Sequence, residues 1–439
     1  MEAKHDQAWR DLLLDAVNEP VPSFTRRDVE LPAIPNKAIA VVGMRRTGKS
    51  TYLWQLLSDR LAQGAERPSL LYLGFDDDRL AGLTLRDLGG LLEEYFRLYP
   101  AGRQGRRVTL FLDEIQVVPG WESFVRRVLD TEAADVFVSG SSAKLLSREL
   151  ATNLRGRAME AQVFPFSFRE FLRHRRREPK APADRLPRAQ RTQLGSDLIA
   201  YLREGGFPEA QGANPRDRAR LLRGYVDSVL LRDVIERHNV THPVALSWLT
   251  RHLLANAAGT FSIHRFTNDL RSQGIGVGKD SLYAFLDHLT DAFLLRVVPL
   301  ATDSERQRMV NPRKVYPVDP ALIPLFDRTG RANEGHALET AVAIELERRG
   351  AEIHYVKTPK GHEVDFLARY PEGTEELVQV CARFDDPATL DRELRALAEA
   401  AEMFPRATRT LVTLAPEAVT TVPLEVEVAE AGAWMLREC

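Results

Sequence analysis

Cysteine is almost absent from this sequence of 439 residues, since only Cys381 and Cys439 occur. Two cysteines cannot form a disulfide framework or a four-cysteine zinc site, and their scarcity is ordinary for a cytosolic protein. Long apolar runs are also missing: no stretch reaches the roughly 18 apolar residues of a membrane-spanning helix. The N-terminus lacks the apolar core of a signal peptide. We therefore expect a soluble cytoplasmic protein without a membrane partner.

The chain has no excess of charge of either sign, with 60 basic and 62 acidic side chains and a net charge of −2. This balance excludes a uniformly basic coat for nucleic acid, but it allows a local basic patch. Residues 169–191 carry nine basic and three acidic side chains, whereas residues 371–439 carry six basic and fourteen acidic ones. The basic segment is typical of a solvated linker or helix surface, or alternatively of a contact with a polyanion.

The length and apolar pattern predict several domains, because 439 residues exceed what one core usually holds. No internal repeat is visible, which disfavours a solenoid or a propeller. Between residues 37 and 192, short apolar strands alternate with helical segments, a pattern typical of a parallel sheet with helices on both faces. The predicted strands are 38–42, 69–75, 108–112, 136–140 and 159–164.

Three further regions flank this core. Residues 1–36 read as a helical lead-in, and residues 193–331 as a largely helical region. Inside the latter, amphipathic segments 261–273 and 279–291 are joined by a Gly-rich turn and followed by a strand-like segment, the order of a winged helix-turn-helix. Residues 332–439 predict a second α/β domain, with helices 334–349 and 388–403 and strands 352–356, 363–369, 376–382, 408–414 and 424–428.

A phosphate-binding loop follows the first predicted strand, where residues 43–51 read GMRRTGKST and match GxxxxGK[ST]. Its glycines let backbone N–H groups approach phosphates, and the following helix, 51–61, adds the positive potential of its N-terminus. Lys49 can reach the β- and γ-phosphates of ATP, and the Ser50 hydroxyl can ligate Mg²⁺. The candidate nucleotide-binding residues are Gly43, Arg45, Arg46, Thr47, Gly48, Lys49, Ser50 and Thr51.

A second acidic motif follows strand 108–112, which ends in Asp113 and Glu114. Asp113 at the sheet edge can hold Mg²⁺, directly or through water, and Glu114 can orient and deprotonate the attacking water. Such a pair after a phosphate-binding lysine indicates hydrolysis of the nucleotide. The predicted activity is therefore that of a Mg²⁺-dependent ATPase.

Polar residues after the fourth strand are candidates for sensing the γ-phosphate. Ser141 is the first choice and Ser142 the second, although a solvated turn explains the same residues. Downstream, Arg155 or Arg157 could neutralise transition-state charge, either within its own chain or in a neighbouring subunit of an oligomer.

These motifs resemble those of one large bacterial and archaeal family, in which an AAA-type P-loop ATPase core is joined to a C-terminal domain of unknown function. The matching stretches extend from about residue 37 to residue 367 and read GMRRTGKST, LFLDEIQ, VSGSSAKLL, LRGRAMEAQVFPFSFREFL, GGFPEA, LLRDVIERH, LETAVAIELERRG and GHEVDFLA. The resemblance implies an AAA+ or ASCE-type core, a winged-helix segment and a restriction-endonuclease-like C-terminal fold.

A nuclease of that fold needs carboxylates for Mg²⁺ and a lysine near the attacking water. The resemblance places Glu339 and Asp365 at the carboxylate positions. Gln379 and Cys381 stand where a glutamate and the lysine would be, and neither supplies the missing chemistry. The alternatives are a migrated lysine, Lys357 or Lys360, or a nuclease-like fold retained for docking or oligomerisation. A zinc site at Cys381, His354 and His362 lacks supporting ligand spacing.

Three functions remain open at the level of sequence. The first is an ATPase that acts as a conformational motor or switch on DNA or a DNA-associated partner, as a homo-oligomer. The second is an ATP-gated, metal-dependent DNA nuclease. The third is an ATP switch that controls a protein partner in signalling or defence. Asp280, Asp287 and Asp291 on the predicted recognition helix oppose contact with phosphates, whereas Arg265, Arg271 and Lys279 favour it.

Overall fold

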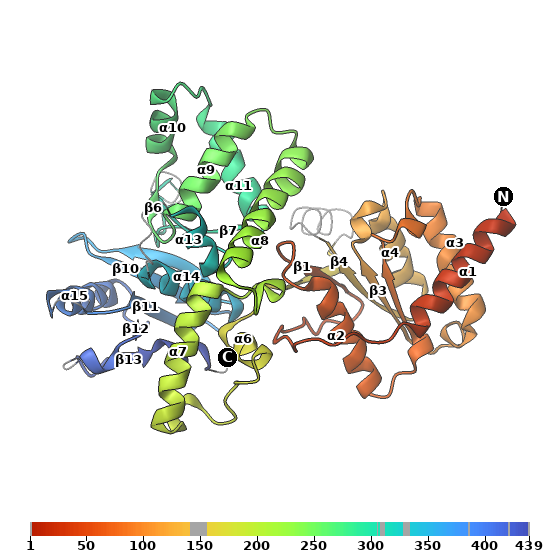
Figure 1. The fold of residues 1–439 in the computed structure, drawn as a ribbon, viewed down its shortest axis with the longest axis horizontal. Coiled ribbons are helices and arrows are strands. Elements are labelled where there is room, and N and C mark those ends of the chain that lie inside the picture. Colours follow the sequence, from red (N-terminus) through yellow and green to blue (C-terminus); the bar gives the residue numbers. More distant parts are fainter. Residues whose placement is uncertain are drawn as a thin grey trace. The chain divides into compact units, whose positions relative to one another are not determined.

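The computed structural model describes residues 2–140, 156–304, 306–307, 312–327, 334–384, 387–419 and 422–437. These residues form two compact units, 1–164 and 165–439 (Figure 1). The sequence pattern extends the ATPase core to residue 192 and begins another domain at residue 332. In the structure, residues 165–192 belong to the second unit, and that unit continues across residue 332.

The first unit contains a parallel sheet in the order β2-β3-β4-β1-β5. β4 lies between β1, which leads into the phosphate-binding loop, and β3, which ends in Asp113. This confirms the predicted α/β core of the ASCE type. The carboxyl ends of β1, β3 and β4 meet at one edge of the sheet, where ligands bind in such folds. The strands are β1 (Ala38–Val42), β2 (Leu70–Gly74), β3 (Val108–Asp113), β4 (Ala134–Ser139) and β5 (Ala158–Gln162).

Helices cover both faces of this sheet, with α2 on one side and α3 and α4 on the other (Figure 1). On the α2 side, Leu53 and Leu57 are buried in a cluster with the stacked rings of Phe111 and Phe137. α1 packs against β2 and α3. The helices are α1 (Glu2–Asn18), α2 (Lys49–Ala62), α3 (Leu85–Leu98) and α4 (Trp121–Thr131), so α2 begins two residues before its predicted start.

The second unit begins with helices and a small antiparallel sheet in the order β6-β8-β7. The predicted helix pair is present as α10 (Ile263–Ser272) and α11 (Lys279–Asp291), followed by β7 (Leu295–Val298). β6 (Thr260–Phe261) and β8 (Arg313–Pro317) were not among the predicted strands. The other elements are α6 (Phe168–His174), α7 (Arg188–Glu204), α8 (Pro215–Ser228), the π-helical η7 (Val229–Glu236), α9 (Pro243–Ala255) and α13 (Ile323–Phe326).

A mixed sheet, ordered β13-β12-β11-β10-β9, forms the rest of the second unit. β9, β10 and β11 pair antiparallel, whereas β11, β12 and β13 pair parallel. This confirms the predicted second α/β region. Its elements are α14 (Glu334–Arg348), β9 (Glu352–Lys357), β10 (Glu363–Arg369), β11 (Glu375–Cys381), α15 (Pro387–Met403), β12 (Thr408–Thr413), β13 (Val426–Glu430) and α16 (Ala431–Met435).

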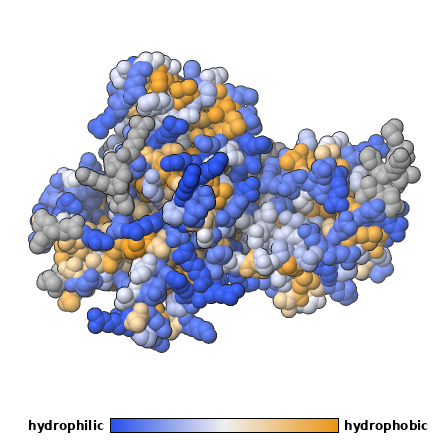
Figure 2. All heavy atoms as spheres, in the orientation of Figure 1, coloured by the Kyte–Doolittle hydropathy of each residue, from blue (hydrophilic) through white to orange (hydrophobic). Residues whose placement is uncertain are grey.

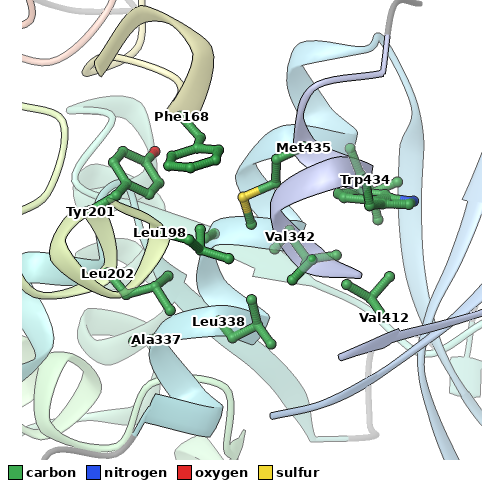
Figure 3. Packing of buried hydrophobic residues seen from close by; sticks show 14 of the residues in the cluster. Phe168, Leu198, Tyr201, Leu202, Ala337, Leu338, Val342, Val412, Trp434 and Met435 are labelled. Atoms are coloured by element: carbon green, nitrogen blue, oxygen red, sulfur yellow. The ribbon is translucent and has the colours of Figure 1, made fainter. Parts of the chain in front are cut away.

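One hydrophobic cluster explains why the second unit starts at residue 165. Phe168 of α6 and Tyr201 of α7 pack in the same cluster as Val342 of α14 and Trp434 of α16 (Figure 3). Phe168 and Trp434 are almost fully buried, and burial of an aromatic side chain is worth roughly 1.5–3 kcal/mol. The segment after β5 is therefore held by contacts that are distant in sequence and that local patterning does not reveal.

The surface is mainly hydrophilic on the face that Figure 2 shows, with scattered hydrophobic patches. Exposed apolar side chains of the second unit include Val244 and Trp248 of α9, which are one helical turn apart. Within the described ranges, none of the helices combines the length and apolar character that a membrane crossing requires.

Candidate active site

The phosphate-binding loop leaves the end of β1 in a conformation that needs glycine at two positions. Gly43 has φ +148°, and a Cβ atom there would lie 2.2 Å from the carbonyl oxygen of Val163. Gly48, directly before α2, has φ 97°, in the left-handed region that glycine adopts without strain. The loop is thus pressed against the chain that follows β5, and its path depends on the absence of side chains.

Lys49 is buried at the first position of α2, and its ammonium group faces back into the loop. The Nζ atom donates hydrogen bonds to the carbonyl oxygens of Gly43 and Met44, each at 3.1 Å. The Thr47 hydroxyl donates to the Met44 carbonyl at 2.9 Å. Arg46 and Ser50 are exposed, as is Thr51, whereas Arg45 is half-buried.

Arg27, in the lead-in segment, holds the loop from behind and was not a sequence candidate. Its guanidinium donates to the carbonyl of Thr47 at 2.8 Å and also to the carbonyl of Phe164. The Arg27 backbone exchanges two hydrogen bonds with the side-chain amide of Gln55 on α2, at 2.7 and 3.0 Å. Because Arg27 is buried, this clamp is shielded from water. Nothing in the local sequence distinguishes Arg27 from the exposed Arg26 beside it.

Asp113 is buried at the end of β3, and two hydroxyl groups hold its carboxylate. The Tyr72 hydroxyl of β2 donates to Asp113 Oδ2 at 2.7 Å, and the Ser139 hydroxyl of β4 donates to Oδ1. The Tyr72 ring stacks on Trp54 of α2, with the ring centroids 4.3 Å apart. Burial raises the pKa of Tyr72, and the nearby Asp113 carboxylate raises it further, so the hydroxyl remains a donor. Neither Tyr72 nor Ser139 was predicted.

Glu114 follows in a left-handed backbone conformation, with φ 55°. Such a conformation is uncommon for a residue other than glycine and concentrates at functional sites. The Glu114 N–H donates to Ser139 Oγ at 3.0 Å, and its carboxylate accepts a hydrogen bond from the Gln116 amide. Ser139 therefore contacts both acidic residues and fixes their relative position.

A polar cavity of about 640 Å³ adjoins Ser50 and Asp113. Three parts of the chain supply its acidic lining: α1 with the residue that follows it, the segment after β2, and the end of β3. Arg79, on the same wall, pairs with both Asp15 and Asp77. Excess negative charge beside a hydroxyl favours a cation over a bare phosphate. The acidic residues are Asp15, Glu19, Asp76, Asp77 and Asp113.

Arg157 lies directly before β5, where Ala38 of β1 donates its N–H to the Arg157 carbonyl. This is the amino edge of the sheet, whereas the phosphate-binding loop leaves the carboxyl edge. Arg157 also forms an ion pair with Asp130 of α4. The structure thus does not bring Arg157 to the nucleotide site of its own chain. Ser141, Ser142 and Arg155 lie outside the described residues.

A second polar centre lies in the mixed sheet, where three of the four nuclease-like candidates meet. Gln379 Nε2 donates to Asp365 Oδ2 at 2.9 Å, and Glu339 shares with Asp365 a lysine from outside the sheet, Lys314 of β8. Lys314 Nζ lies 3.0 Å from Glu339 Oε1 and 2.8 Å from Asp365 Oδ1. Cys381 instead donates its thiol to the Arg383 carbonyl at 3.2 Å.

The electrostatics of this centre follow from burial. Burial raises the pKa of the Cys381 thiol to about 11, so the thiol carries no charge at neutral pH. Burial and the charge of Asp365 raise the pKa of Glu339 to about 8, although Lys314 opposes the shift. Burial lowers the pKa of Lys314, but its carboxylate neighbours outweigh that effect and hold its pKa well above the usual value. Lys314 is therefore a charged, buried ammonium.

The expected migrated lysines are placed differently. Lys360 pairs with Glu399 of α15 at 3.3 Å, and Lys357 is exposed at the end of β9. Lys314 could not be recognised from sequence, because 51 residues separate it from Asp365. The only local signal is its spacing from Tyr316, two positions on, which puts both side chains on one face of a strand.

A family model described as an AAA domain matches residues 35–172, and a model described as a domain of unknown function (DUF8612) matches residues 195–330. The uncharacterized protein MJ1544 of Methanocaldococcus jannaschii is 32% identical over 379 residues, which cover 85% of this chain and 81% of that protein. The chain belongs to this family of AAA-type P-loop ATPases. An uncharacterized protein of Haemophilus influenzae is 29% identical over 349 residues, or 79% of this chain and 82% of that protein.

Solved structures resemble this AAA-type chain more loosely. The Walker-type ATPase PABY2304 of Pyrococcus abyssi is 16% identical, with 74% of this chain and 94% of that chain covered and a TM-score of 0.39. The ORC2 protein of Aeropyrum pernix is 12% identical, with 74% and 92% covered and a TM-score of 0.35. Both TM-scores are too low to establish a shared arrangement of the whole chain, so no property of these proteins carries over.

Proposed function

We propose that the first unit binds ATP with Mg²⁺ and hydrolyses it. The observation that carries this proposal is that the Ser139 hydroxyl hydrogen-bonds to both the Asp113 carboxylate and the Glu114 N–H. These residues lie at the sheet edge where the loop with Lys49 also begins. A phosphate-binding loop alone indicates nucleotide binding, whereas a held Asp113 carboxylate followed by a glutamate with a fixed backbone suits activation of water.

On the phosphate side, Lys49 is the group that would neutralise the β- and γ-phosphates. Its ammonium now donates to two loop carbonyls, and phosphate oxygens would replace them as acceptors. Arg27 keeps the Thr47 carbonyl turned away from the phosphates, so that the loop presents N–H groups to the anion. Gly48 lets α2 begin directly after the loop, so the positive end of the α2 dipole also faces the phosphates.

Ser50 and Asp113 are the residues that would hold Mg²⁺, and the acidic cavity beside them fits a divalent cation. When bound, Mg²⁺ would supply positive charge that offsets the negative charge of the nucleotide's phosphates. Tyr72 and Ser139 orient the Asp113 carboxylate for this role through their two hydroxyl donors.

Glu114 would orient the attacking water and accept its proton. Its backbone is left-handed, its N–H donates to Ser139, and the residue is half-buried rather than enclosed in the core, so water can reach it. Ser141, Ser142 and Arg155 stay candidates for contact with the γ-phosphate. Arg157 stays a candidate only for a neighbouring subunit, as in ATPases that place an arginine in trans.

We propose further that the nucleotide state is transmitted to the second unit, which acts on DNA or a DNA-associated partner. Direct contact by the basic segment 169–191 has limited support, because several of its arginines are neutralised: Arg173 by Glu178, Arg175 by Glu204 and Arg177 by Asp197. A switch on a protein partner is the second candidate. It is favoured by the exposed apolar pair on α9, where Val244 is 61% and Trp248 43% exposed.

Glu114→Gln tests the hydrolytic proposal. The amide keeps the size of the side chain but cannot accept the proton of water, so we expect the ATPase rate to fall by roughly 10²–10⁴-fold while ATP binding persists. Glu132→Gln, on the same unit, is the matched control, and Lys49→Ala is the blank. Unchanged hydrolysis in Glu114→Gln would show that Glu114 is not the base.

The same assay with single-stranded, double-stranded and branched DNA separates the two candidate targets. Stimulation of the wild-type rate by DNA supports action on DNA. A rate that DNA leaves unchanged, together with no DNA binding at low salt, supports the switch on a protein partner.

A further inference from the structure

The polar centre around Lys314 has the carboxylates of a metal site but the contacts of a salt-bridge cluster. Lys314 Nζ lies within 3.0 Å of oxygens from three carboxylates: Glu339 at 3.0 Å, Glu363 at 2.9 Å and Asp365 at 2.8 Å. A divalent cation shared by these side chains would need the same position. The ammonium therefore stands at the point on which the carboxylates converge.

The remaining donors at the centre also exclude a cation. Asp365 Oδ2 accepts from Gln379 Nε2 at 2.9 Å and from the Val380 N–H at 3.0 Å. Gln379 Nε2 donates as well to Glu393 at 2.7 Å, while its Oε1 accepts the Asp365 N–H. These partners orient the amide with its NH₂ group toward the carboxylates, so the side chain presents hydrogen atoms where a metal would need lone pairs.

Burial shields most of the centre from substrate, and only the Glu363 side chain, 37% exposed, reaches the surface. Lys314, Asp365 and Gln379 are 3%, 7% and 5% exposed. A lysine that assists metal-bound water must reach a phosphodiester, whereas Lys314 is covered by its own sheet and by α14. Over the described ranges, no group of three His, Cys, Asp or Glu side chains is arranged to hold a metal ion. The residues present thus do not fit the Mg²⁺ that the nuclease-like resemblance implies.

The backbone around Asp365 explains how a strand outside the mixed sheet reaches the carboxylates. The pairing of β10 with β9 shifts register between Val364 and Leu367, so Asp365 lies in a stretch where the ladder is irregular. On the other edge of β9, Tyr355 exchanges backbone hydrogen bonds with Pro299 and Ala301, in the segment after β7. This junction brings the small sheet, and with it β8, against the mixed sheet.

We propose that the Lys314 ammonium permanently replaces a divalent cation at this centre, so that the second unit is held together without a metal. The positive charge that joins β8 to α14 and β10 is the Lys314 side chain itself. The cluster therefore has a structural role and not a hydrolytic one. Removal of the ammonium would leave converging carboxylates with no counterion. Because these side chains are not arranged as a metal site while Lys314 is present, they would rearrange to bind Mn²⁺ or Mg²⁺ in its place. The inference is independent of ATP hydrolysis in the first unit.

Titration of the full-length chain with Mn²⁺, without nucleotide and followed by electron paramagnetic resonance, tests this proposal. We expect that the wild type has no Mn²⁺ site that depends on Asp365, so that Asp365→Asn leaves its Mn²⁺ binding unchanged. Lys314→Ala should gain a Mn²⁺ site at least about tenfold tighter than the nonspecific Mn²⁺ binding of the wild type, and the Lys314→Ala/Asp365→Asn double variant should lose this site. Lys360→Ala, which removes an exposed lysine of the same unit, should gain none.

Two results would overturn the replacement of the metal by lysine. One is a wild-type Mn²⁺ site that Asp365→Asn abolishes, which would make Lys314 a lysine beside a metal. The other is a folded Lys314→Ala protein with no gain in Mn²⁺ affinity. If Lys314→Ala does not fold, Lys314→Met, which keeps the apolar stem, takes its place. The wild-type titration decides the first point without any Lys314 variant.

Discussion

Replacement of Arg27 by methionine should destabilise the first unit far more than the same change at Arg26. Methionine keeps an unbranched apolar stem in place of the buried arginine stem but removes the guanidinium. The carbonyls of Thr47 and Phe164 then lose their charged donor in a site shielded from water. Arg26, by contrast, pairs with Asp59 at 2.7 Å while 57% of its side chain is exposed.

The expected size of the effect follows from these contacts. Each buried carbonyl that loses its donor costs about 1–3 kcal/mol, which gives roughly 4 kcal/mol for the two acceptors of Arg27. An exposed ion pair such as that of Arg26 is worth about 0–1 kcal/mol. At about 2–4 °C per kcal/mol for a unit of this size, Arg27→Met should lower the melting temperature by roughly 8–16 °C.

Thermal unfolding of the full chain, with and without ATP, measures this difference. The transition that ATP shifts upward belongs to the nucleotide-binding unit, because a ligand stabilises only the state that binds it. Arg27→Met should also weaken ATP binding, since the Thr47 carbonyl is no longer held away from the phosphates. Equal melting temperatures for Arg27→Met and Arg26→Met would refute the assignment of Arg27 as a buried clamp.

Two other changes probe the same site. Gly43→Ala should destabilise the first unit by about 3 kcal/mol, because its Cβ would meet the Val163 carbonyl at 2.2 Å. Gly195→Ala, inside a helix with open space around it, should instead stabilise the protein by about 0.5–1 kcal/mol. Circular dichroism during urea unfolding measures both free energies, and an unchanged stability of Gly43→Ala would contradict the close approach. Tyr72→Phe keeps the aromatic ring but removes the hydroxyl that holds Asp113, so the Mg²⁺ concentration for half-maximal ATPase activity should rise by about 10–100-fold. An unchanged Mg²⁺ dependence would show that Tyr72 does not position Asp113.

The candidate nucleotide site of the first unit could be predicted from the sequence because its signals are local. Gly43 to Thr51 form one continuous motif, and Asp113 and Glu114 end one apolar strand, so a short window contains each signal. Parallel strands then bring both motifs to the same edge, which topology requires without any further information. The α/β class and the parallel sheet were predicted for the same reason.

The residues that hold the loop and the acidic pair could not be predicted from the sequence, because each contacts a residue far from it along the chain. Ser139 contacts Asp113 from 26 residues away, Tyr72 from 41, and Arg27 contacts Phe164 from 137. Their types are ordinary for a strand or a loop, and only their position beside a carboxylate or a carbonyl gives them a role. The grouping of residues 165–192 with the second unit was not predicted for a similar reason, since α6 is held by residues far along the chain.

The sequence by itself predicted a phosphate site of the ATPase type, because periodicity, glycines and an Asp-Glu pair encode that prediction locally. It also predicted, through the family resemblance alone, that a nuclease-like site at Glu339 and Asp365 would lack its second glutamate and its lysine. Only the tertiary structure decided what stands at that centre: Lys314, brought by the small sheet, meets Glu339 and Asp365. A buried ammonium is stable only where carboxylates surround it. Here those carboxylates come from elements far apart in the sequence, so only the folded chain brings them to Lys314.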